Sequence, residues 1–182
     1  MTSDPTPAPL LMSNGRPLII AVIGGGSPPP RAIALADEVG RELARRGVMV
    51  VCGGLSGVME AVCRGAKAEG GTTIGILPGN EPVSANAFID IPIMTGMGYA
   101  RNVIVVKTGR AAIAIDGAYG TLSEIGHALG DNIPVIGLDT WQLPTRDNLA
   151  IHVDHAASPA DAVEKAIAVA RARDAGEGSR LH

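Results

Sequence analysis

Three glycine-rich segments offer backbone amides that can bind an anion. They are residues 24–27 (GGGS), 53–57 (GGLSG) and 116–121 (DGAYGT), and each lies at the end of a short apolar run. Glycine lets backbone N–H groups approach a ligand closely, and the N-terminus of the following helix adds a partial positive charge that suits phosphate. A tight strand-to-helix turn also needs glycine for its own geometry, so one such loop is weak evidence. Three of them at successive strand ends favour a phosphorylated small-molecule ligand.

These loops lack the fingerprints of the common nucleotide and cofactor sites. GGGSPPP at 24–30 is not a G-x-G-x-x-G turn that opens a helix, because prolines follow the turn, and G-x-x-x-x-G-K-[ST] does not occur. Pyridoxal phosphate needs a lysine near the strand ends for its Schiff base. Lys67, Lys107 and Lys165 all fall within predicted helices. The sequence therefore argues against NAD hydride transfer, P-loop hydrolysis and a pyridoxal-phosphate decarboxylase.

The elements that must position these loops alternate between apolar runs and helical segments. Continuous runs such as 18–23 (LIIAVI) are typical of parallel strands that are covered on both faces. The predicted strands are 18–23, 48–52, 72–77, 88–93, 111–115, 134–138 and 149–153, and the predicted helices are 31–46, 58–69, 121–129 and 158–171. This alternation predicts an α/β fold: a doubly wound, mostly parallel sheet with helices on both faces and its ligand site at the carboxyl ends of the strands.

Composition limits the classes of partner and the compartment. With 15 Lys and Arg against 18 Asp and Glu, the net charge is −3, so the basic footprint of a nucleic-acid-binding protein is missing. The aromatic residues are Phe88, Tyr99, Tyr119 and Trp141, too few for a base-stacking platform. No apolar run reaches the roughly 18 residues of a membrane span. Cys52 and Cys63 lack metal-ligand spacing, and the start lacks a signal-peptide pattern, so we expect a cytoplasmic protein.

A chain of 182 residues can bury its apolar surface around one core, so we expect a single domain at residues 17–172. Residues 1–16, with three prolines and no periodic pattern, are predicted to be a flexible leader, and residues 173–182 a flexible tail. His152, Asp154 and His155 are the strongest candidates for a metal cluster. We interpret them as a polar strand end, because His155 would point away from the other two, and predict no metal site.

Five segments together resemble the Lonely Guy (LOG) superfamily, also labelled lysine decarboxylase-like. They are GGLSGVMEAVCRGAKAEGG, ILPG, TGMGYARNVIVV, DGAYGTLSEIGHAL and PVIGL. The resemblance covers roughly residues 18–140, with motif order and spacing intact, and is nearest to the branch that contains molybdenum-cofactor carrier proteins. It implies a Rossmann-like fold in which residues 97–109 form a helix, although their VIVV run favours a strand on propensity alone.

The resemblance also implies a set of site residues and a reaction. Matched by motif, the residues are Gly53, Gly54, Gly57, Arg101, Gly117, Gly120, Thr121 and Glu124. The glycine-rich loops add further ligand-binding candidates, namely Gly25, Gly26, Ser27, Asp116 and Tyr119. In LOG enzymes the Arg and the Glu support cleavage of the N-glycosidic bond of a nucleoside 5′-monophosphate, which releases the base and ribose 5-phosphate.

The residue types suit that chemistry. Gly120 and Thr121 open a predicted helix whose free N–H groups can hold a phosphate. Glu124 follows one turn later, where it can stabilise an oxocarbenium-like transition state or position the attacking water. Arg101 can hold the phosphate or pair with the Glu124 carboxylate. The alternative for Glu124 is that a first-turn Glu only complements the helix dipole.

Three departures from the LOG motifs favour binding without catalysis. Asp116 stands in place of a Pro and adds negative charge near the phosphate loop, Ala118 replaces a Gly and can block a backbone state with positive φ, and Asn102 replaces a Lys. The alternative function is therefore a carrier of a phosphorylated cofactor such as the molybdenum cofactor. In either case no further cofactor is required, and the bound ligand would be a nucleoside monophosphate or the molybdenum cofactor. We also expect a homodimer or higher homo-oligomer, and a base or pterin ring beside Tyr99 or Tyr119.

Overall fold

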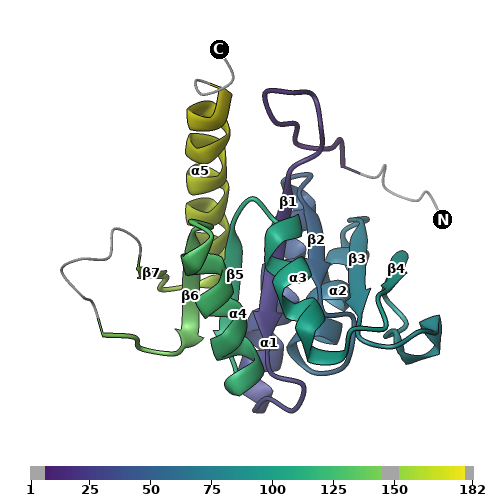
Figure 1. Cartoon of the computed structure of the whole chain (residues 1–182). Coiled ribbons are helices and arrows are strands. Elements are labelled where there is room, and N and C mark those ends of the chain that lie inside the picture. The colour runs from purple at the N-terminus through teal and green to yellow at the C-terminus, as the bar shows by residue number, and fades with distance from the viewer. Residues whose placement is uncertain (1–6, 145–151, 179–182) are drawn as a thin grey trace.

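The computed structural model describes residues 7–144 and 152–178, which form one parallel sheet between two layers of helices (Figure 1). The strands are β1 (Ile19–Gly24), β2 (Met49–Cys52), β3 (Thr73–Leu77), β4 (Ile91–Met94), β5 (Ala112–Asp116), β6 (Val135–Thr140) and β7 (Val153–His155). The helices are α1 (Pro30–Arg45), α2 (Val58–Ala68), α3 (Asn102–Thr108), α4 (Tyr119–Gly130) and α5 (Pro159–Gly178), with 3-10 turns η1 (Pro82–Ser84) and η2 (Gly98–Arg101). The predicted Rossmann-like α/β fold is confirmed.

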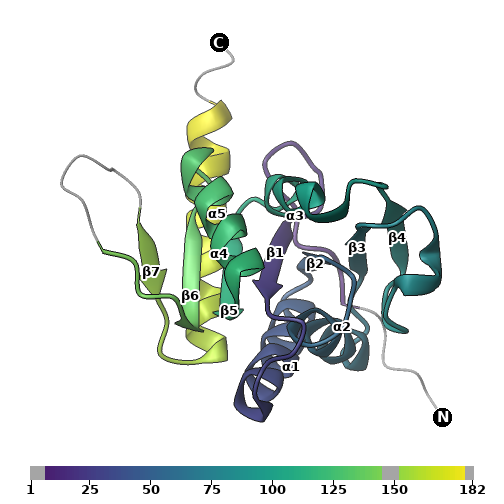
Figure 2. The same ribbon diagram turned by 60° about the horizontal axis from the view of Figure 1, so that its bottom comes forward.

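The strand order places a change of direction at the middle of the sheet. The order is β4-β3-β2-β1-β5-β6-β7, and every neighbouring pair is parallel. From β1 the chain steps outwards to β4 and then returns to β5, on the other side of β1. The segments that leave β1 and β5 therefore run to opposite faces of the sheet. Ligands of such sheets bind in the crevice between these two segments. Figure 2 brings this carboxyl end of the strands forward.

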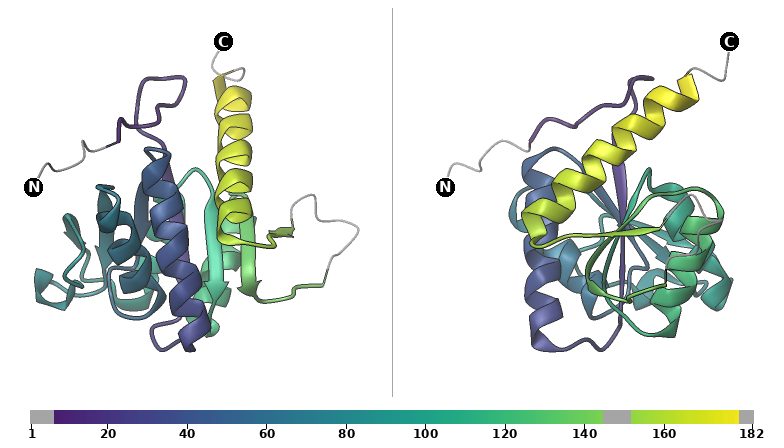
Figure 3. Two further views of the ribbon diagram at one scale, coloured as in Figure 1. Left: turned by 180° about the vertical axis from the view of Figure 1, so that it is seen from behind. Right: turned by 90° about the vertical axis from the view of Figure 1, so that its left-hand side faces the viewer.

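Each face of the sheet has its own apolar core. Helices α1, α2 and α5 cover one face, and α3 and α4 cover the other (Figures 1 and 3). Along β1, Ile20 and Val22 belong to the first core, whereas Ala21 and Ile23 belong to the second. Side chains of a strand alternate between faces, so a strand buried on both sides reads as the continuous apolar run seen in the sequence.

The ambiguous segment 97–109 is helical. It forms η2 and then α3, and Val105 and Val106 are fully buried in the core shared with α4. The helix expected from the family resemblance is confirmed, and the strand favoured by the VIVV run is wrong. Packing of these side chains against the sheet outweighs the small intrinsic preference of β-branched residues for strands.

Several predicted boundaries need correction. The short strand expected at 88–93 is found at β4. The edge strand expected at 149–153 lies largely outside the described residues, and β7 begins at its last residue, Val153. Helix α5 continues past 171 to Gly178. Within the segment expected to be a leader, the Leu10 amide donates to the Gly47 carbonyl at 2.8 Å, so residues near Leu10 are attached to the domain. Among the described residues, no helix is both long enough and apolar enough to cross a bilayer.

Helices α1 and α2 pack closely and carry the second glycine-rich loop. A Cβ atom at Gly40 would lie 2.1 Å from the Val62 carbonyl oxygen, and one at Gly65 would lie 1.9 Å from the Asp37 carbonyl oxygen, so only glycine permits this approach.

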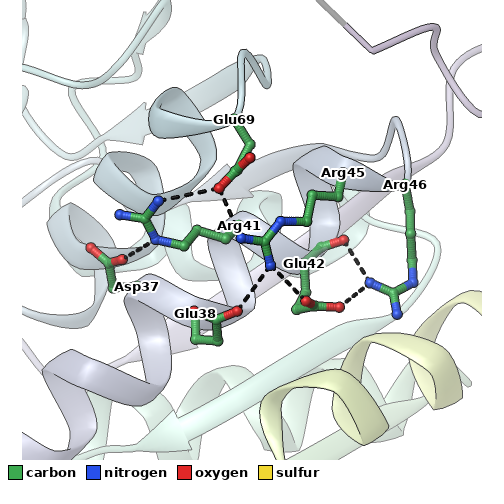
Figure 4. Close-up of polar contacts among 7 residues, drawn as sticks. All are labelled: Asp37, Glu38, Arg41, Glu42, Arg45, Arg46 and Glu69. Atoms are coloured by element: carbon green, nitrogen blue, oxygen red, sulfur yellow. Dashed lines mark hydrogen bonds and ion pairs between the residues drawn. The ribbon is translucent and has the colours of Figure 1, made fainter.

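Arginines along α1 also bind Glu69, just after α2, with Arg41 Nη1 at 3.2 Å and Arg45 Nη2 at 2.9 Å from its Oε1 (Figure 4). The same network includes Asp37, Glu38, Glu42 and Arg46. Such partly exposed ion pairs each contribute at most about 1 kcal/mol, so the close backbone packing fixes α2.

Candidate functional site

A pocket of about 280 Å³ opens at the carboxyl ends of the central strands. Its walls come from the loops after β1, β2 and β5, together with η2 and the first turns of α2 and α4. The lining residues are Gly24, Gly25, Gly26, Leu55, Met59, Tyr99, Arg101, Asn102, Ala118, Gly120, Thr121 and Glu124. The three glycine-rich loops and the Arg and Glu singled out in the sequence are therefore brought to one place.

Arg101 and Glu124 form the charged part of the pocket. The Arg101 Nη1 atom lies 4.0 Å from Glu124 Oε1, and each side chain is 8% exposed. At that separation the two groups attract each other without a hydrogen bond. Burial raises the pKa of the Glu124 carboxyl to about 7, against the opposing effect of the Arg101 charge. Burial also lowers the pKa of Arg101, but a guanidinium remains charged at any physiological pH. Glu124 can therefore take up and release a proton near neutral pH.

Hydrogen bonds from three directions fix Arg101 and its neighbour. Arg101 Nη2 donates to the Gly53 carbonyl at 3.2 Å, and Nη1 donates to Asn102 Oδ1. Asn102 Nδ2 donates to Ser123 Oγ at 3.2 Å, and Ser123 Oγ donates to the Gly120 carbonyl at 2.7 Å. This chain connects the second loop, η2 and the first turn of α4, so it holds the guanidinium at the base of the pocket.

The N-terminus of α4 provides amides for an anion. Leu122 N, which donates to the Ala118 carbonyl at 3.1 Å, is the first amide in the α4 ladder. The amides of the preceding residues, 119–121, have no acceptor within the helix, as at every helix start. A Cβ atom at Gly120 would have no neighbour within 4 Å, and Gly120 and Thr121 line the pocket, so open space lies beside this helix start. Space, free donors and the helix dipole together suit a phosphate group.

The backbone at the end of β5 differs from the expectation for Ala118. Its φ is −101°, an ordinary value, and the obstruction expected at this residue is not found. The left-handed region is used by Asp116 (φ 50°) and Gly117 (φ 114°) instead. Asp116 ends β5, and its Oδ2 would lie 3.5 Å from a Cβ atom at Gly25. A carboxylate thus lies beside the first glycine-rich loop, as the sequence suggested.

Glycines of the second loop permit close packing of the segments behind the pocket. Gly57 has φ 72°, and a Cβ atom there would lie 2.4 Å from the Gly25 carbonyl oxygen. Val58 N donates to the same oxygen at 3.0 Å, so the first and second loops are joined at the start of α2. A Cβ atom at Gly53 would lie 2.5 Å from Arg101 Nη2, and one at Gly54 would contact Leu77. These glycines permit close packing and do not line the pocket.

Other predicted site residues lie at the rim or outside. Ser27 is exposed and does not line the pocket, and Gly117 packs against Thr121. Tyr119 is 81% exposed, does not line the pocket, and stacks at a tilt on Trp141 with ring centroids 6.2 Å apart. Tyr99 lines the pocket while remaining 88% exposed. Of the two tyrosines considered for a ring-binding role, Tyr99 is therefore the one at the pocket.

Sequence reasoning missed the apolar wall formed by Leu55 and Met59, and it treated Asn102 only as a departure from a motif. Met59 could have been found, because it begins the apolar stripe of α2. The sequence also did not predict that the two cysteines lie together beneath the site. Cys52 and Cys63 are buried with their sulfur atoms 3.5 Å apart, and Gly54 N donates to Cys52 Sγ at 3.3 Å.

The sequence profile of the SLOG cluster4 family matches residues 17–171. The chain belongs to this family. It is 33% identical to a cytokinin riboside 5′-monophosphate phosphoribohydrolase from Mycobacterium tuberculosis, over 67% of this chain and 71% of that protein.

Two solved structures of the same fold have a different described role. The molybdenum cofactor binding protein of Rippkaea orientalis superposes with a TM-score of 0.78 at 36% identity, covering 85% of this chain and 98% of that chain. The molybdenum cofactor carrier protein of Chlamydomonas reinhardtii superposes with a TM-score of 0.74 at 33% identity, with the same coverage. The LOG-like superfamily assignment is thus confirmed, and relatives of both functional kinds are found within it.

Proposed function

We propose that this protein binds nucleoside 5′-monophosphates and hydrolyses their N-glycosidic bond. The observation that carries the proposal is the buried Glu124 carboxyl, which lines the pocket, lies beside Arg101 and has a pKa raised to about 7. A site that only holds an anion gains nothing from a buried acid, which weakens anion binding whenever it is ionised. An acid that titrates near neutral pH is suited to give and take protons in a reaction.

Each part of the pocket has a place in this reaction. The 5′-phosphate would accept hydrogen bonds from the free amides at the start of α4, with the Thr121 hydroxyl as a further donor. The base would lie between Leu55, Met59 and Tyr99, whose apolar surfaces suit a flat ring. The ribose would then lie over Glu124, because this residue follows Thr121 by one helical turn.

The proposed reaction adds one water to the substrate. The bond between C1′ and the base nitrogen breaks, its electron pair leaves with the base, and the water oxygen bonds to C1′. Ionised Glu124 takes a proton from the attacking water and, once protonated, supplies it to the departing base. The negative charge of Glu124 also stabilises the oxocarbenium-like transition state, and Arg101 holds the phosphate in place. The products are the free base and ribose 5-phosphate.

A panel of nucleotides tests the proposal. The purified protein is incubated with AMP, GMP, CMP and, as a matched control without phosphate, adenosine, and the free base is quantified by chromatography. We expect release from at least one monophosphate, much slower release from the nucleoside, and at least a hundredfold loss in Glu124→Gln. Glu81→Gln, which removes an exposed carboxylate that does not line the pocket, serves as the control variant and should retain activity. Absence of free base from every monophosphate would contradict the proposal.

The second candidate is a carrier of a phosphorylated pterin cofactor. It is favoured by the two molybdenum cofactor proteins of the same fold. Saturable binding of a pterin phosphate by the wild type, with no release of base from any monophosphate, would support the carrier over the enzyme. Turnover abolished by Glu124→Gln would rule out a carrier-only role.

A further inference from the structure

One nitrogen of Arg101 has two possible acceptors, and it uses the neutral one. Nη1 donates to the amide oxygen of Asn102, while the Glu124 carboxylate remains 4.0 Å away. A guanidinium and a carboxylate that are free to meet form a shorter, charge-assisted hydrogen bond of about 2.8 Å. The structure therefore shows an arginine and a glutamate that are close enough to interact strongly but are kept apart.

The contacts of Asn102 explain the separation. Asn102 is 5% exposed, and its Nδ2 donates to Ser123 Oγ in the first turn of α4. Because the amide nitrogen is used in that contact, the amide oxygen faces Arg101. The opposite side of the guanidinium is held by the Gly53 carbonyl through Nη2. Arg101 is thus restrained by two neutral acceptors, one at each Nη atom, and a move of Nη1 onto Glu124 would displace it from its present position beside Asn102.

We propose that Asn102 is a positioning residue that holds the Arg101 guanidinium away from Glu124 and so leaves the Glu124 carboxyl free to exchange a proton. The inference rests on the proposed function in so far as that function needs such a proton. Without Asn102, Nη1 is released and moves toward Glu124 Oε1, where the ion pair favours the ionised carboxylate.

The size of the effect follows from the distances. Closing the pair from 4.0 Å to about 2.8 Å, with an effective dielectric constant of about 20, strengthens the attraction enough to lower the pKa of Glu124 by about one unit. The other titratable group that interacts with Glu124 is the Cys52 thiol at the end of β2, and Tyr99 interacts with Arg101 from η2. Neither residue is altered by a change at Asn102, so the expected shift reports on Arg101.

The test is a titration of the Glu124 carboxyl in the ligand-free protein. Glutamate labelled with 13C at the side-chain carboxyl is incorporated, and the resonance of Glu124 is assigned by its loss in Glu124→Gln. Asn102→Ala and Asn102→Leu both remove the acceptor, and Leu retains most of the volume, so one of the two suffices if the other does not fold. Asn102→Asp is the comparison variant, because it keeps an oxygen acceptor for Arg101 and adds a negative charge that raises the pKa of Glu124.

We expect the pKa of Glu124 to fall by about one unit in Asn102→Ala or Asn102→Leu, and not to fall in Asn102→Asp. An unchanged pKa of Glu124 in a folded Asn102→Ala or Asn102→Leu variant would overturn the proposal. An equal fall in Asn102→Asp would also overturn it, because the loss of the acceptor would then not be the cause. No substrate is present, so this result is independent of whether the protein hydrolyses nucleotides.

Discussion

Replacing Glu124 by Gln should change how the stability of the protein depends on pH. Burial raises the pKa of Glu124 from its usual 4.5 to about 7 in the folded state. Between these two values the unfolded chain has lost this proton while the folded chain retains it, so stability falls as pH rises through that window. The contribution of Glu124 is present in full below pH 4.5 and lost above pH 7. This shift of two and a half pKa units corresponds to about 3 kcal/mol in the free energy of unfolding.

Urea unfolding followed by circular dichroism measures this effect. At pH 4 the wild type and Glu124→Gln should have similar free energies of unfolding, because Glu124 is protonated in both states of the wild type. At pH 8 Glu124→Gln should gain about 3 kcal/mol relative to the wild type. Glu81→Gln reports the effect of removing one exposed negative charge, which is subtracted. A gain that is the same at both pH values, or a loss at pH 8, would show that Arg101 stabilises the ionised carboxylate and that our reasoning is wrong.

Three further predictions concern the pocket, the thiols and the surface. Gly120→Ala and Gly126→Ala each place a methyl group in open space on α4, so both variants should fold. Only Gly120→Ala should weaken AMP binding, by tenfold or more in calorimetry, because Gly120 lines the pocket and Gly126 does not. Equal affinities of the two variants for AMP would contradict the phosphate site. Cys52 and Cys63 are both buried, and the hydrogen bond with Cys52 together with burial raises the pKa of the Cys63 thiol. An aromatic disulfide reagent should therefore modify neither cysteine until denaturant is added, and rapid modification in native buffer would refute this. Apolar side chains are exposed at the edge strand β4, so we expect a homodimer in light scattering. Ile93→Lys should weaken this dimer, and a monomeric wild type would argue against it.

The sheet could be predicted from the sequence because its strands are buried on both faces. A continuous apolar run such as that of β1, closed by glycine, has few other interpretations. Residues 97–109 were different, since Val105 and Val106 suit a strand by propensity and become helical through packing on the sheet. Only the family resemblance predicted that outcome. Edge elements such as β4 and β7 carry a weaker pattern, and their bounds were displaced.

The site was predictable in its members but not in its contacts. The family resemblance named Glu124 and Arg101 as residues of one site, yet it could not show that the pair is held at 4.0 Å or that burial raises the pKa of the acid. We propose that the separation depends on Asn102, which contacts Ser123 of α4 across the fold. The backbone states at Asp116 and Gly117 were equally hidden, because a motif alignment indicates which residue changed and not which φ it takes.

The central claim is that this pocket cleaves nucleoside 5′-monophosphates with Glu124 as its acid and base. A time course of AMP by proton NMR tests it most directly, since the ribose H1′ signal moves when the N-glycosidic bond is broken and the signals of free adenine replace those of AMP. We predict many equivalents of adenine and ribose 5-phosphate per protein chain, and none with Glu124→Gln. An AMP spectrum that stays unchanged while AMP binds saturably, or turnover that survives in Glu124→Gln, would contradict the account.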